Sequence, residues 1–108
     1  AAIVGLGGAL AAAGAAGAVT GVHAPTRAQR AAILRALVKQ DGTTAGVTSV
    51  YLANADHRLA GVCQRTPDAG KVAFLFRASG ASWRYVLNSQ SATASNRAEL
   101  TLERACLR

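Results

Sequence analysis

The clearest pattern in this chain is an alternation of large apolar residues with smaller or polar ones in its second half. The alternation runs over residues 72–77 and again over residues 83–88, and a short segment rich in serine and glycine separates the two runs. Because side chains two positions apart lie on the same face of a strand, the pattern predicts a β-hairpin. The side chains expected on one face of it, at the centre of the core, are Val72, Phe74, Phe76, Trp83, Tyr85 and Leu87.

Two further strands are predicted before this hairpin. Residues 47–53 and 58–65 are rich in apolar and β-branched residues, and each run ends at a turn, over residues 54–57 and 66–70. Gly61 lies inside the second run, where a glycine indicates either a β-bulge or a point of close packing. Together with the hairpin, these runs predict a four-stranded antiparallel meander.

A helix is predicted before the strands. Thr26 and Gln29 have the spacing of a capping box, in which each side chain satisfies a backbone amide of the first turn, and Gly42 is a natural C-terminal stop. The apolar positions that recur at helical spacing are Ala31, Ile33, Leu34, Leu37 and Val38. The cations on the rest of its surface are Arg27, Arg30, Arg35 and Lys39. Such a helix can lie on an anionic membrane, but we expect it to pack on the sheet.

The C-terminal residues 97–107 fit two descriptions. Leu100 and Leu102 alternate as in a strand, whereas residues 98–106 can also be written as a helix. We expect a short helix or turn that leads into a terminal edge segment. The predicted fold class is therefore α+β, with one N-terminal helix packed on a four-stranded antiparallel meander and a short C-terminal helix or edge segment, in two layers.

Residues 1–24 differ in composition from the rest of the chain, because they are built largely from Ala and Gly and contain no Asp, Glu, Lys or Arg. An apolar stretch followed by small residues is typical of a secretory signal peptide, and residues 13–15 and 16–18 both fit its cleavage site. We expect residues 1–24 to be a signal peptide remnant, with a membrane anchor as the alternative, and residues 25–108 to be a small α+β domain. This predicts a secreted or cell-envelope location.

The two cysteines, Cys63 and Cys106, are predicted to form a disulfide, because a small extracytoplasmic domain with an even cysteine count usually pairs them. The alternative is a reactive thiol on Cys63 with His57 as its base. No third group that would orient such a pair is evident in the sequence. The disulfide would connect the C-terminal segment to the second predicted strand.

The sequence contains no motif that indicates an enzyme or a bound cofactor. It has no G-x-S-x-G element and no closely spaced pair of catalytic carboxylates. His23 and His57, with two distant cysteines, do not have the ligand spacing of a zinc site. We therefore predict a non-enzymatic protein without a metal or cofactor.

The formal net charge is +7, and all of the cations lie after residue 26. Such a charge indicates either an anionic partner or a solvated surface. The twelve Lys and Arg residues are dispersed along the chain, so we do not expect nucleic-acid binding.

A candidate binding surface lies around the predicted hairpin turn, because Trp83 directly after the turn is the aromatic residue best placed for partial exposure. Its predicted members are Trp83, Arg58, Arg65, Arg77 and Arg84. Arg77 and Arg84 are expected on the sheet face opposite Trp83. The expected partner is a protein or a cell-envelope component. The alternative is an anionic polymer or a membrane surface, and residues 1–22 offer a second route to a membrane.

The order of these motifs resembles a family of small secreted proteins of actinobacteria to which no function is assigned. The resemblance covers about residues 28–107 and is carried by residues 47–60, by Gly80-Ala-Ser-Trp83 and by the terminal Leu-x-Leu-x-x-x-Cys. Members commonly have Trp where Leu59 stands and a partner cysteine near Ser91. The resemblance implies export and a helix followed by several strands, and it implies no site residue.

Overall fold

The computed structural model describes residues 19–108, so both candidate cleavage sites and most of the predicted signal segment lie outside the described residues. In chain order the elements are β3 (Val22–His23), α3 (Arg27–Asp41), β4 (Val47–Ala53), β5 (Leu59–Thr66), β6 (Gly70–Ser79), β7 (Ser82–Asn88) and α4 (Arg97–Leu107). The strands form one antiparallel sheet in the order β3-β4-β5-β6-β7. The predicted α+β class and antiparallel meander are therefore confirmed.

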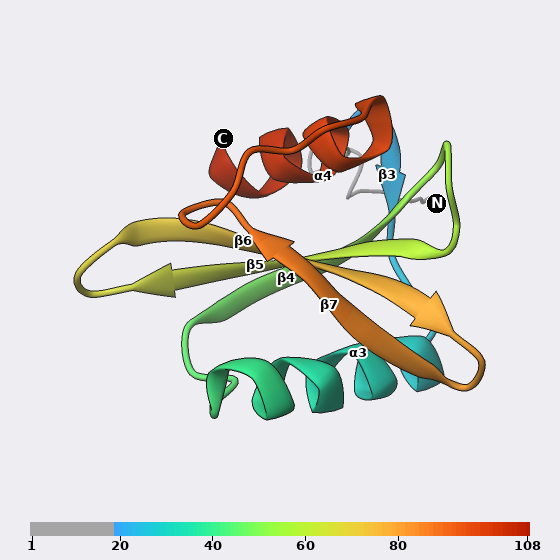
Figure 1. The fold of residues 1–108 in the computed structure, drawn as a ribbon, viewed down its shortest axis with the longest axis horizontal. Helices are drawn as coiled ribbons and strands as arrows, with labels where there is room; N and C mark the ends of the chain where they lie inside the picture. The colour runs from blue at the N-terminus through green and yellow to red at the C-terminus, as the bar shows by residue number, and fades with distance from the viewer. Residues whose placement is uncertain (1–18) are drawn as a thin grey trace, which may run out of the picture.

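The sheet is covered on both faces, by α3 on one side and by α4 on the other (Figure 1). The structure therefore has three layers where two were expected. It also has five strands where four were expected, because Val22 and His23 pair with Ala53 and Leu52 at one edge. This additional strand comes from the segment expected to precede the domain. Neither helix in the described part of the chain is long and apolar enough to cross a membrane.

The C-terminal segment is a helix along its whole length, and the expected edge segment is not formed. Asn96 caps the helix, and its side-chain oxygen accepts a hydrogen bond from the Glu99 N–H at 2.9 Å. Leu102 and Cys106, four positions apart, are buried against the sheet, whereas Leu100 is exposed. The alternation of Leu100 and Leu102 was therefore misleading, because only the helical spacing places the apolar residues on one face.

Helix α3 begins and ends where the sequence predicts. Thr26 and Gln29 form the capping box, with distances of 2.8 and 3.1 Å, and Gly42 ends the helix in the left-handed conformation, with φ of 84°. Ile33 and Leu37 are fully buried against the sheet, but Val38 is 46% exposed. The predicted apolar stripe is therefore wider than the face that the sheet covers.

The hairpin of β6 and β7 is confirmed, but its side chains do not all share one face. Phe76 pairs with Tyr85 and Leu75 pairs with Leu87, so that Val86 is an extra residue, a β-bulge. A one-residue shift moves the following side chain to the opposite face. Trp83 and Tyr85 consequently pack on the α3 side, whereas Leu87 packs on the α4 side, contrary to the prediction.

Helix α4 approaches the sheet closely at Gly61 in β5. A Cβ atom at this position would lie 3.2 and 3.3 Å from side-chain atoms of Leu102. The pairing of β5 with both neighbours is continuous at Gly61, so this glycine is a point of close packing and not a bulge. Leu102 is fully buried there, together with Leu59 and Leu75.

A disulfide between Cys63 of β5 and Cys106 of α4 fastens this contact, as predicted. The two Cα atoms are 4.8 Å apart, and 43 residues separate the cysteines in the chain. Because both sulfurs are bonded, Cys63 is not the reactive thiol of the alternative prediction. The bridge joins the last helix to the central strand of the sheet.

Replacement of both cysteines, Cys63→Ala with Cys106→Ala, is expected to lower the free energy of unfolding by about 4 kcal/mol, the loop-closure entropy of a loop of 43 residues. Urea unfolding of the variant and of the oxidised protein measures the difference. The reduced wild-type protein is the control, because it loses the bridge but keeps both side chains. A loss below about 1 kcal/mol in both would contradict this role.

The carboxylates of Glu99 and Glu103 lie one helical turn apart in α4 and have different environments. Glu99 is buried, and its Oε1 accepts hydrogen bonds from the N–H and hydroxyl of Ser95 at 2.8 and 3.0 Å. Glu103 has a buried oxygen, Oε2, without a hydrogen-bond partner among residues 19–108. Burial, with the negative charge of Glu99, raises the pKa of Glu103. A raised pKa means that the ionised carboxylate destabilises the fold.

Glu103→Gln is therefore expected to raise the free energy of unfolding at pH 7, by less than about 1 kcal/mol after solvent screening. The folded chain binds the Glu103 proton more tightly than the unfolded chain. The loss of folding stability caused by ionised Glu103 therefore develops as pH rises above the ordinary pKa of 4.5 and is absent below it. Urea unfolding at pH 3 and pH 7 tests both points. The matched control is Asp68→Asn, which removes an exposed carboxylate and is expected to change the stability little. A Glu103→Gln protein that is less stable than wild type at pH 7 would contradict the assignment.

Candidate functional site

Three of the predicted surface arginines come together near the turn between β6 and β7. Arg77 and Arg84 are directly opposite each other in the two strands. Arg58 precedes β5, and its carbonyl accepts the N–H of Ala78 at 2.8 Å, which fixes it beside the same end of β6. All three side chains line one cleft with a volume of about 570 Å³. The expected placement of Arg77 and Arg84 on the face opposite Trp83 follows from the observed register.

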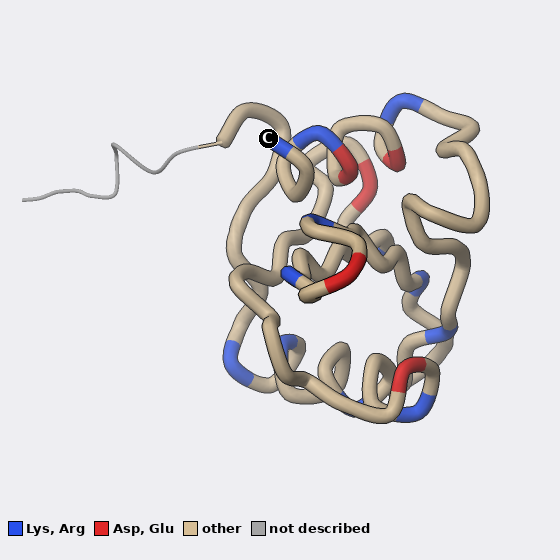
Figure 2. The backbone as a smooth tube through the Cα atoms, turned by 90° about the vertical axis from the view of Figure 1, so that its left-hand side faces the viewer, with Lys and Arg blue, Asp and Glu red and all other residues tan. Residues whose placement is uncertain are grey.

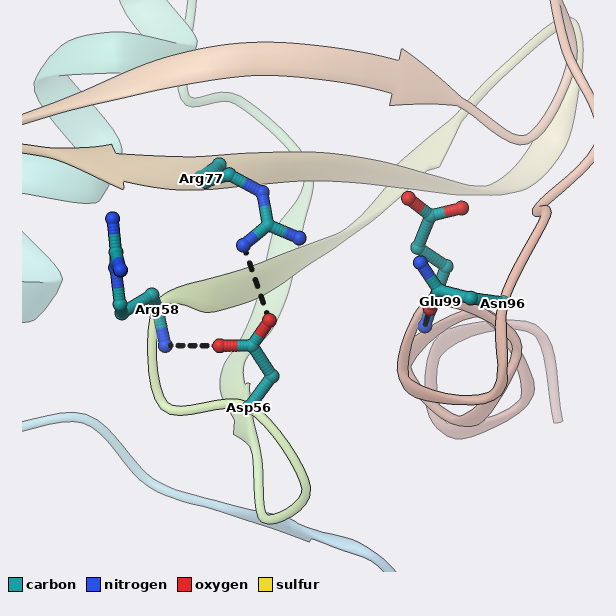
Figure 3. A network of polar contacts seen from close by, with 5 residues as sticks. All are labelled: Asp56, Arg58, Arg77, Asn96 and Glu99. Atoms are coloured by element: carbon teal, nitrogen blue, oxygen red, sulfur yellow. Dashed lines mark hydrogen bonds and ion pairs between the residues drawn. The ribbon is translucent and has the colours of Figure 1, made fainter.

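One carboxylate, that of Asp56, contacts this cluster (Figure 3). Its Oδ1 accepts the backbone N–H of Arg58 at 3.0 Å, and its Oδ2 accepts Nη1 of Arg77 at 3.1 Å. The hydrogen bond from Arg58, followed by the contact with Arg77, lowers the pKa of Asp56. Within residues 19–108 this is the one side-chain ion pair, so Arg58 and Arg84 carry no carboxylate partner there.

A second hollow, of about 250 Å³, lies between α3 and β7. Ala32 and Ala36 leave room along it, because their side chains are short. Its charged and aromatic lining consists of Arg35, Lys39, Trp83 and Arg84. Arg84 lines both this groove and the arginine cleft, so the two hollows meet at the edge strand β7. We call the surface of Arg35, Lys39, Arg58, Arg77, Trp83 and Arg84 the basic surface.

Arg35 and Lys39 were not among the predicted site residues. Their spacing of four positions places them on the same face of α3, and the alanines at positions 32 and 36 indicate the side on which the helix leaves space. That signal was present in the sequence. The predicted helix, however, did not show that its cations lie beside β7.

Arg65 lies apart from the other predicted surface residues. It pairs with Lys71 at the far end of β5, seven residues from Arg58, which corresponds to roughly 23 Å along a strand. There it lines a separate hollow with Lys71 and Arg108. Of the five predicted surface residues, Arg65 alone therefore lies outside the basic surface.

The charge of the two helices differs. Helix α3 carries four cations and one carboxylate, whereas α4 carries two of each (Figure 2). The basic surface borders α3, so the cationic excess of this helix adds to the charge of the strand arginines. Of the two helices, α3 is therefore the more cationic.

The two histidines lie near each other. The rings of His23 and His57 are 5.6 Å apart in an edge-to-face arrangement, and His23 Nδ1 hydrogen-bonds the side-chain oxygen of Asn54. In the described part of the chain, no three His, Cys, Asp or Glu side chains gather as metal ligands would.

Comparison of the chain with family models, with curated proteins and with solved structures gives no match. The resemblance to small secreted actinobacterial proteins therefore stays a prediction.

Asp56→Asn tests the carboxylate that holds Arg77, because Asn keeps an acceptor for the Arg58 N–H but loses the charge. The pKa of Asp56 is lowered in the folded chain, so its contribution is present above the ordinary value of 3.8 and is lost as pH falls through the folded value. We expect the variant to be less stable than wild type at pH 7, by less than about 1 kcal/mol, and equally stable near pH 2.

Urea unfolding across this pH range provides the measurement. Asp68→Asn, at an exposed position in the turn before β6, is the matched control and is expected to change little. A difference between Asp56→Asn and wild type that persists unchanged at low pH would contradict an ionic origin.

Proposed function

We propose that this chain is a small exported domain that binds an anionic partner, a protein or a component of the cell envelope, and performs no chemistry on it. The observation that carries the proposal is the gathering of Arg58, Arg77 and Arg84 on one cleft, with a single carboxylate among them. Like charges brought together are unfavourable in a free protein. A bound anion would relieve this repulsion.

The chemistry of arginine favours carboxylate or phosphate groups as the recognised feature. A guanidinium is planar, always charged, and donates two parallel hydrogen bonds to such a group. Arg58 and Arg84 have no carboxylate partner within residues 19–108, so their donors are available to a ligand. Arginine does not release its proton in proteins, so these three side chains supply positive charge and no general base.

Export is supported by two observations and is in line with the predicted family resemblance. A disulfide in a domain of this size is typical of an oxidising compartment. Residues 1–24 are largely Ala and Gly and contain no Asp, Glu, Lys or Arg, a composition that fits a signal segment. The resemblance to secreted actinobacterial proteins points the same way.

A second candidate function is adsorption to an anionic membrane surface through α3. The outer side of this helix has an apolar hollow lined by Leu34, Val38 and Ala31, with Arg35 and Lys39 at its rim. Val38 is 46% exposed there. Apolar residues flanked by cations on a helix surface are the pattern of an interfacial helix.

The double variant Arg58→Gln/Arg84→Gln tests the proposal. With sodium polyphosphate and poly-L-glutamate as probes, we expect at least a tenfold loss of affinity and a shallower dependence of binding on salt, because fewer counterions are released. Trp83 is the one tryptophan of the chain and lines the basic surface, so its fluorescence reports binding directly.

The matched control is Arg97→Gln/Arg104→Gln, which removes the same charge from α4 and is expected to change the affinity less than twofold. Equal losses in the two double variants would show that only net charge matters and would refute the proposed site. The second candidate, membrane adsorption through α3, predicts that the protein sediments with anionic lipid vesicles. It would be favoured if Arg58→Gln/Arg84→Gln left this sedimentation unchanged.

A further inference from the structure

Strand β7 is the last strand of the sheet, and within residues 19–108 no strand pairs with its outer edge. The turn between β6 and β7 has two residues, so its flanking residues, Ser79 and Ser82, are a hydrogen-bonded pair. Backbone groups alternate in direction along an antiparallel strand. The N–H and C=O groups of Trp83 and Tyr85 therefore point away from β6, toward the open edge.

This edge has few of the features that usually prevent pairing with another chain. Residues 82–85 contain no proline and no lysine, and they run regularly from the turn to the bulge at Val86. The bulge ends the regular stretch, so an added strand has room beside Ser82–Tyr85 only. Trp83 and Tyr85 together offer about four backbone hydrogen bonds there, one donor and one acceptor for each residue.

Both sides of an added strand would meet cations. Side chains on its α3 side would enter the groove of about 250 Å³ over Ala32 and Ala36, which Arg35 and Lys39 border. Side chains on the other side would lie next to Arg84 and the arginine cleft. Acidic residues at alternate positions of the incoming chain would complement this arrangement.

We propose that the partner of this domain docks as an extended acidic peptide, which adds a strand to the edge of β7 and places its carboxylates on the basic surface. The inference rests on the proposed function, because it concerns the same arginines. Strand addition derives affinity from main-chain hydrogen bonds and specificity from alternate side chains. Here, the main chain would bind Trp83 and Tyr85, and the side chains would bind Arg35, Lys39 and Arg84.

A second copy of this chain fits the same edge poorly. An antiparallel pair of β7 strands related by two-fold symmetry brings the Arg84 residues of both copies near one another, and like charges opposite each other in a sheet are destabilising. It would also bring the cations of both α3 helices together. The observed charges thus favour an acidic chain.

The test uses a ten-residue peptide of alternating glutamate and threonine, blocked at both ends. The comparison peptide has the same sequence with every backbone nitrogen methylated, so that it keeps the charge but has no N–H donors. We expect the first peptide to bind the oxidised protein and methylation to weaken binding at least tenfold. Hydrogen exchange of the Trp83 and Tyr85 amides should slow with this peptide and not with polyphosphate. A lysine–threonine peptide is the charge control and should not bind.

Each outcome separates the inference from the proposed function. Equal binding of the methylated and unmethylated peptides would overturn strand addition and keep the anionic partner. Binding of polyphosphate but of neither acidic peptide would also overturn strand addition and keep the anionic partner. The ligand would then be a polymer. Failure of every anionic probe would overturn both. Hydrogen exchange of the Trp83 amide could also slow as the protein concentration rises, without any peptide. That result would identify a second copy of the chain as the occupant and would overturn the inference.

Discussion

The packing of α4 against β5 is the contact on which the rest of the domain depends. The sheet has apolar side chains on both faces, so each face must be removed from water. Helix α3 covers one face with residues close in sequence to the first strands, whereas within residues 19–108 the last helix covers the other face. Gly61 admits Leu102 at close range, and the bridge from Cys63 to Cys106 holds the helix there. Without this contact, Leu59 and Leu75 would face solvent.

With both faces covered, the sheet formed by the described residues is open at its two edges, and one of these is the β7 edge beside the turn to β6. The basic surface lies there, where two strands and α3 meet. Asp56 neutralises part of it and orients Arg77, while Arg58 and Arg84 stay without a carboxylate partner within residues 19–108. Structural duties and the proposed recognition are therefore divided: apolar layers on the two faces stabilise the fold, and the β7 edge carries the basic surface.

Much of this fold could be predicted from local signals. The capping box at Thr26, the glycine stop at Gly42 and the paired cysteines each act over a short range or by simple chemistry, and the structure has all of them. The errors arose where tertiary contacts decide. Residues 97–107 satisfy two periodicities, and only the available sheet face selects the helix. The bulge at Val86 has no signature in the sequence. For the same reason, the sequence suggested Arg77 and Arg84 as neighbours but did not associate Arg35 and Lys39 with them.

The bulge at Val86 divides β7 into two parts that belong to different cores. Residues on its turn side, such as Tyr85, pack with α3, and Leu87 beyond it packs with α4. A change of surface residues near the turn therefore does not propagate into the packing under α4. Substitutions at the exposed end of the hairpin can therefore alter the proposed binding edge while the disulfide-linked half of the domain keeps its packing.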